Sequence, residues 1–131
     1  MGNGAILASH PRILVLEDNS NVLDVLSEAL EINGYDIVSG TSGCEGLEHL
    51  QHMEKMPDLI ISDLMMPDMD GISFIEEVRR NPLWSQIPVI VVSGYHGEER
   101  RALESGANVF IIKPFNMDKL DTTIRCLVQA S

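Results

Sequence analysis

Five short apolar runs recur along the chain, and each of them is rich in β-branched residues. They span residues 13–16, 37–38, 59–61, 89–92 and 109–112. Runs that are continuously apolar, rather than alternating with polar positions, are typical of strands buried on both faces. The pattern therefore predicts five strands of a parallel sheet that is covered on both sides.

Apolar residues at helical spacing mark four segments between and after these runs. They are Leu23, Leu26 and Leu30; Leu47 and Leu50; Ile72, Ile75 and Val78; and Leu120, Ile124, Leu127 and Val128. Another helical segment, 97–105, is the fourth along the chain and has only Ala102 and Leu103 as apolar residues. A helix there has little to bury, so we expect either a mobile element or a short, solvated surface helix.

Strictly alternating strands and helices predict right-handed crossovers and an α/β fold with helices on both faces of the sheet. Five units of this length favour a flavodoxin-like (βα)5 three-layer sandwich with the strand order 2-1-3-4-5. At 131 residues the chain fits one domain. We predict a flexible N-terminal arm over residues 1–11 and a folded domain over residues 12–131.

Composition and charge narrow the function classes. The formal net charge is −11, which argues against direct nucleic-acid binding and against docking on an anionic membrane. No run approaches the roughly 18 apolar residues of a membrane span, and the N-terminus does not have the pattern of a signal peptide, so a cytoplasmic location is expected. Cys44 and Cys126 show no metal-ligand spacing, which favours two free, buried or half-buried thiols over a disulfide.

Polar residues follow four of the five predicted strands. The pairs are Glu17 and Asp18, Ser62 and Asp63, Ser93 and Gly94, and Lys113 and Pro114. In the order 2-1-3-4-5 these four strands are neighbours, and ligands of open parallel sheets bind beyond the carboxyl ends of the strands. We therefore expect these side chains to converge on one site.

The residue types at this site indicate phosphoryl chemistry. Three crowded carboxylates repel one another unless a cation shares the site, and hard oxygen ligands without histidine or cysteine favour Mg²⁺. Lys113 adds a second positive charge, Ser93 adds a hydrogen-bond donor, and one carboxylate can act as the nucleophile.

At this point the sequence resembles a known family, the receiver domains of bacterial two-component response regulators, over residues 12–129. The matching segments are ILVLEDN at 13–19, DLIISDLMMPDMDG at 58–71, PVIVVSG at 88–94 and GANVFIIKPF at 106–115. By this resemblance Asp63 is the phosphorylated aspartate. Mg²⁺ would be bound by Asp18, by Asp63, by the backbone carbonyl of Met65, and through water by Glu17.

The resemblance implies further roles. Ser93 and Lys113 would contact the phosphoryl group, Phe110 would be the aromatic switch residue, and the Lys113–Pro114 peptide bond would be cis. Met65 and Tyr95 occupy the two positions that flank the path of the hydrolytic water. Because both side chains are bulky, we hypothesise that they slow loss of the phosphoryl group.

The function implied by the resemblance is a phosphoryl-accepting switch. Asp63 takes the group from a phosphohistidine of a kinase or phosphotransfer protein, and the acyl phosphate alters the surface of the fourth strand, the fourth helix and the fifth strand. Downstream, a partner protein or a fused effector domain would respond. The chain would catalyse its own phosphorylation and dephosphorylation without being a turnover enzyme. Two alternatives are a pseudo-receiver that only binds partners and, less favoured, an aspartyl-phosphate hydrolase.

Overall fold

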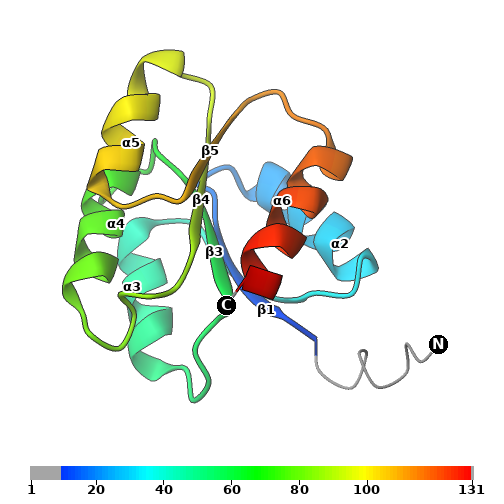
Figure 1. The fold of residues 1–131 in the computed structure, drawn as a ribbon, viewed down its shortest axis with the longest axis horizontal. Helices are drawn as coiled ribbons and strands as arrows, with labels where there is room; N and C mark the ends of the chain where they lie inside the picture. The colour runs from blue at the N-terminus through cyan, green and yellow to red at the C-terminus, as the bar shows by residue number, and fades with distance from the viewer. Residues whose placement is uncertain (1–9, 131) are drawn as a thin grey trace.

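The structure, a computed structural model, describes residues 10–130 and is an α/β sandwich of three layers (Figure 1). The strands are β1 (Arg12–Leu16), β2 (Asp36–Gly40), β3 (Leu59–Asp63), β4 (Val89–Ser93) and β5 (Val109–Ile112). The helices are α2 (Ser20–Ile32), α3 (Gly43–His52), α4 (Gly71–Arg80), α5 (Glu99–Ser105) and α6 (Met117–Ala130), with a short 3-10 helix η1 (His96–Glu98) before α5.

All strand pairs are parallel, and the strand order is β2-β1-β3-β4-β5, which confirms the predicted topology. Figure 1 shows α2 and α6 on one face of the sheet and α3, α4 and α5 on the other. Successive residues of a strand point to opposite faces. In β1, Ile13 and Val15 join the core under α2 and α6, whereas Leu14 and Leu16 join the core under α3 and α4.

Burial on both faces holds for the central strands but not for the edge. All five residues of β3 and of β4 are buried. In β2, Asp36 and Ser39 are exposed, while Ile37 and Val38 are half-buried. The difference arises because β2 has a neighbour on one side only, so part of it faces solvent.

The expected burial of the cysteines is wrong. Cys44 and Cys126 are free, as predicted, but both are exposed. Leu120 and Ile124 fix the face of α6 that packs on the sheet, and Cys126 lies off that face. Among residues 10–130, no helix is long and apolar enough to cross a bilayer. Residues 1–9 of the predicted arm lie outside the described part of the chain.

The hydroxyl of Tyr35 ties the segment before β2 to α6. This buried side chain donates a hydrogen bond of 2.7 Å to Oδ1 of Asp121, and Arg125 forms a 2.8 Å ion pair with the other oxygen of the same carboxylate. Burial, followed by the hydrogen bond to Asp121, raises the pKa of Tyr35 to about 12. The hydroxyl therefore remains neutral, and remains a donor, at physiological pH.

The substitution Tyr35→Phe should lower the free energy of unfolding by about 1–2 kcal/mol, because it leaves the half-buried Asp121 carboxylate without this donor. A raised folded-state pKa stabilises below the ordinary value of 10.0, and this contribution is lost as the pH rises through about 12. In urea unfolding, the free energy of unfolding of Tyr35→Phe should lie below that of the parent by a constant amount from pH 6 to 9. This difference should shrink above pH 10. Tyr95→Phe, at an exposed tyrosine, should change stability by less than about 0.5 kcal/mol. Equal stability of Tyr35→Phe and the parent would contradict this assignment.

Candidate functional site

The register of the sheet brings the polar strand ends together. Leu16 of β1 pairs with Ser62 of β3, so the residues that follow or end these strands, Glu17 and Asp63, are neighbours. Ser93 of β4 pairs with Ile112 of β5, which places Lys113 one residue beyond the pair. The four strand ends that were predicted to form one site therefore lie together at the carboxyl edge of the sheet.

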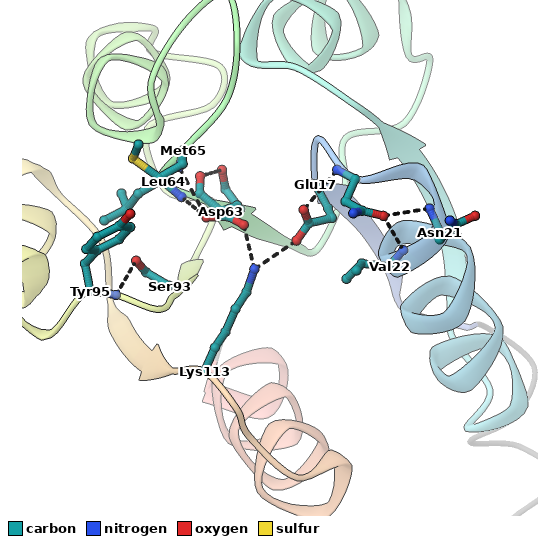
Figure 2. Close-up of polar contacts among 11 residues, drawn as sticks. Glu17, Asn21, Val22, Asp63, Leu64, Met65, Ser93, Tyr95 and Lys113 are labelled. Atoms are coloured by element: carbon teal, nitrogen blue, oxygen red, sulfur yellow. Dashed lines mark hydrogen bonds and ion pairs between the residues drawn. The ribbon is translucent and has the colours of Figure 1, made fainter.

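Lys113 bridges two buried carboxylates. Its Nζ donates a hydrogen bond of 2.6 Å to Oδ2 of Asp63 and one of 3.0 Å to Oε1 of Glu17. Figure 2 shows the lysine reaching up between the two acids from the end of β5. Glu17 and Asp63 are only 4% and 6% exposed. The two buried negative charges thus share one ammonium group.

Backbone amides hold the remaining oxygens of the two acids. Oδ1 of Asp63 accepts hydrogen bonds from the amides of Leu64, at 2.7 Å, and Met65, at 3.2 Å. Oε2 of Glu17 accepts one of 3.1 Å from the amide of Asn19, whose own side chain caps α2. Hydrogen bonds of this kind stabilise the charged form of a carboxylate.

The pKa shifts follow from burial and pairing. Burial is the largest influence on Glu17 and raises the pKa of its carboxyl, with hydrogen bonds from Asn19 and Lys113 acting in the opposite direction. Burial alone would lower the pKa of Lys113, but its hydrogen bonds to Asp63 and Glu17 outweigh this effect and raise that pKa. The surrounding acids therefore favour the charged form of Lys113, whereas burial opposes the charged form of Glu17.

Three carboxylates lie close enough to share a cation. Ligand oxygens of Glu17, Asp18 and Asp63 all lie within 4.8 Å of one another. Asp18 is exposed, whereas the other two are buried, so the group opens to solvent on the side of Asp18. An all-oxygen set that combines buried and open positions fits Mg²⁺, which retains several of its waters when bound.

Ser93 connects the site to the chain that leads to α5. Its side chain is fully buried, its Oγ accepts a 3.1 Å hydrogen bond from the amide of Tyr95, and its carbonyl accepts one of 2.7 Å from the amide of Lys113. The Lys113–Pro114 peptide bond is cis. Phe110 is half-buried and packs against the core under α3 and α4.

Gly71, the first residue of α4, has a structural role that was not predicted from the sequence. Its amide donates a 2.8 Å hydrogen bond to the carbonyl of Leu64, which folds the loop after β3 back on itself. A Cβ at this position would lie 2.5 Å from the carbonyl oxygen of Asp63 and 2.8 Å from Cα of Leu64. A glycine directly after the N-cap residue Asp70 is visible in the sequence. Its importance follows only from the close approach of its backbone to that of Asp63 and Leu64.

Comparison with known proteins identifies the family. The profile of the response regulator receiver domain matches residues 13–125. The chain belongs to this family. It is 34% identical over 118 residues to the transcriptional regulatory protein KdpE of Staphylococcus aureus, covering 88% of this chain and 49% of KdpE. Among solved structures, the signal receiver domain of a signal transduction histidine kinase from Syntrophus aciditrophicus superposes with a TM-score of 0.84 and 33% identity, covering 92% of this chain and 91% of that one.

The relatives correct the expectation that excluded nucleic acid as a partner. RpaA of Synechocystis, 31% identical over 121 residues, is named a DNA-binding transcriptional regulator, and the match covers 91% of this receiver domain but 49% of RpaA. The chain spans about half the length of the curated relatives it matches. The net charge of −11 describes these 131 residues alone, and it has no bearing on DNA binding by another region of a longer regulator.

We predict that Gly71→Ala destabilises the receiver domain by about 1–3 kcal/mol, because the added methyl group overlaps backbone atoms that cannot rotate away. Gly97→Ala is the matched control, since a Cβ at that exposed glycine meets nothing within 4 Å. It should change stability by less than about 0.5 kcal/mol. Thermal or urea unfolding measures the stability of both variants. Equal stability of the two would show that the backbone near Asp63 leaves room for a methyl group at position 71.

Proposed function

We propose that this receiver domain is a phosphoryl-accepting switch in which Asp63 receives the phosphoryl group from a phosphohistidine. The supporting observation is the environment of Asp63. It is a buried carboxylate with a lysine ammonium at 2.6 Å and two further carboxylates within 4.8 Å. A lysine and a site for a divalent cation around one acid are suited to a reaction that brings a phosphoryl group to that acid.

In the transfer, an oxygen of Asp63 forms a bond to phosphorus as the bond from phosphorus to the donor nitrogen breaks. The released imidazole keeps the electron pair of that bond. Lys113 neutralises charge on the phosphoryl oxygens, and Glu17 holds the lysine while its bond to Asp63 is exchanged. Asp18, Asp63 and the Met65 carbonyl would hold Mg²⁺ directly, and Glu17 through water. When bound, the ion offsets the negative charge of the incoming phosphoryl group.

The switch itself is assigned to Ser93 and the segment that follows it. The Ser93 hydroxyl now accepts a hydrogen bond from the amide of Tyr95, and it would turn to donate to a phosphoryl oxygen on Asp63. Phe110 would then move inward. A nearly complete shift between two states needs a difference of about 5 kcal/mol in the phosphoryl contacts.

Phosphorylation and dephosphorylation are reactions of the domain on itself, since receiver domains are generally not turnover enzymes. The relatives named transcriptional regulators favour an output in gene expression through the rest of a longer protein. The Syntrophus receiver instead belongs to a histidine kinase. The phosphoryl switch is the function that both contexts have in common.

Acetyl phosphate with Mg²⁺ should add one phosphoryl group to the protein, as seen by intact mass. Asp63→Asn should form no adduct, and EDTA should abolish the adduct of the parent, because both the nucleophile and the cation are required. Asp68→Asn is the control, since it removes an exposed carboxylate from the same loop and should leave the adduct in place. An adduct that survives in Asp63→Asn would mean that another residue is the acceptor.

Met65 and Tyr95 are each 57% exposed, and Figure 2 shows them on the side of Asp63 opposite Glu17. If they obstruct water, the double variant Met65→Asn, Tyr95→Ala should shorten the phosphoryl lifetime roughly ten-fold, equivalent to about 1.4 kcal/mol of activation free energy. The decay of the adduct, followed by mass after removal of the donor, measures this. Ile32→Ala, at an exposed residue at the end of α2, should leave the lifetime unchanged. An unchanged lifetime in the double variant would rule out the obstruction.

A further inference from the structure

Arg79, in the last turn of α4, binds the segments that lead into β4 and β5, at the edge of the sheet opposite the phosphoryl site. Nε donates a 3.0 Å hydrogen bond to the carbonyl of Gly106, and Nη1 donates to the carbonyls of Ser85, at 3.0 Å, and Ile87, at 2.7 Å. Nη2 donates a 3.0 Å bond to Oδ1 of Asn108. One guanidinium thus joins the loop before β4 to the turn between α5 and β5.

This arginine differs from the others of the described chain. Arg12, Arg80, Arg100, Arg101 and Arg125 each form an ion pair with a carboxylate, whereas none of the ion pairs among residues 10–130 includes Arg79. It is half-buried, and burial lowers the pKa of its guanidinium, which nevertheless stays protonated. The N–H groups of its planar guanidinium donate mainly to backbone carbonyls, so Arg79 fixes backbone positions and does not balance the charge of an acid.

The turn after α5 is shaped around this contact. Gly106 has φ 125°, and a Cβ there would lie 2.7 Å from Cγ of Arg79. The amide of Ala107 closes the helix end on the carbonyl of Ala102 at 3.1 Å. Oδ1 of Asn108 also accepts a 2.8 Å hydrogen bond from the amide of Val89. The C-terminal end of α5 is therefore anchored to the start of β4.

The other end of α5 has little support. Neither η1 nor α5 has a side-chain hydrogen bond at its N-cap, and the buried residue of α5 is Ala102, near its middle. The chain that enters η1 is linked to the phosphoryl site by the bond from the amide of Tyr95 to Oγ of Ser93. A helix anchored at one end and loosely held at the other moves at the loose end.

We propose that Arg79 is the fixed pivot of the switch, so that phosphorylation moves residues 94–101 while residues 105–109 stay in place. This inference rests on the proposed function, because the movement begins when the Ser93 hydroxyl turns toward a phosphoryl group on Asp63 and draws its oxygen from the Tyr95 amide. Arg79 is a positioning residue. It lies at the edge of the sheet opposite Asp63. It determines which residues move upon phosphorylation and does not take part in the phosphoryl transfer.

Amide hydrogen exchange with and without acetyl phosphate and Mg²⁺ tests the pivot, with intact mass to verify the adduct in every sample. In the parent, phosphorylation should change exchange in 94–101 and leave 105–109 unchanged. In Arg79→Met, exchange in 105–109 should rise about ten-fold before phosphorylation and should change again upon phosphorylation. Arg80→Met, the adjacent exposed arginine, is the matched control and should behave as the parent. Arg79→Lys keeps the charge but loses the fork, and it should resemble Arg79→Met; it serves in place of Arg79→Met if that variant does not fold.

The outcomes separate the two proposals. If the parent forms no adduct, the proposed function fails, and the pivot fails with it. If the adduct forms but exchange in 105–109 changes as much as in 94–101, the pivot alone is wrong. The pivot is also wrong if the Arg79 variants show the parent's exchange pattern. A general loss of stability would accelerate exchange across the whole domain, whereas loss of the pivot confines the new change to 105–109.

Discussion

The ion pair group of Glu17, Lys113 and Asp63 is the interaction on which the site depends. It joins the ends of β1, β3 and β5 across the carboxyl edge of the sheet, with distances of 3.0 and 2.6 Å between Nζ and the two acids. Burying charges has a high desolvation cost, and the loss of one member leaves the others uncompensated. Two buried carboxylates against one ammonium also leave an excess negative charge. That excess supports the proposal that the same group takes up a divalent cation and, with the cation present, a phosphoryl group.

The fold supplies this arrangement through register rather than through local sequence. Glu17 and Lys113 are separated by 96 residues, and they meet because parallel pairing places the ends of β1, β3, β4 and β5 at one edge. All five residues of β3 and of β4 are buried, so a one-residue slip would exchange the side chains that pack on the two faces of the sheet. The loop after β3 is then held in place by the approach of Gly71 to Asp63, which leaves the Leu64 and Met65 amides directed at the carboxylate.

Much of this could be predicted from the sequence because it depends on periodicity. Apolar runs gave the strands, their alternation with helices gave the order, and the polar residues after each run gave Asp63, Ser93 and Lys113 as one group. The hydrogen-bond partners of individual side chains could not be predicted, because they depend on distances between segments that are far apart in the sequence. The pattern placed Glu17 beside the predicted cation site, but it did not show that Lys113 and the amide of Asn19 hold its two oxygens. An arginine in the last turn of a helix is normally predicted to be a solvated charge. Nothing in the sequence pattern indicates that Arg79 donates hydrogen bonds to three backbone carbonyls.

The weak helical pattern of residues 97–105 can be interpreted from the difference between the two ends of α5. Low apolar content alone fits either a mobile element or an unimportant surface helix. The structure adds an asymmetry, because the Arg79 contacts hold the end near Gly106 while the end near Tyr95 connects to Ser93 by a hydrogen bond between backbone and side chain. In the proposed switch, a small rotation of the Ser93 hydroxyl would release the loose end without disturbing the anchored one. Little buried area is then a requirement of the switch, since a well-packed helix would need far more than the phosphoryl contacts to move it.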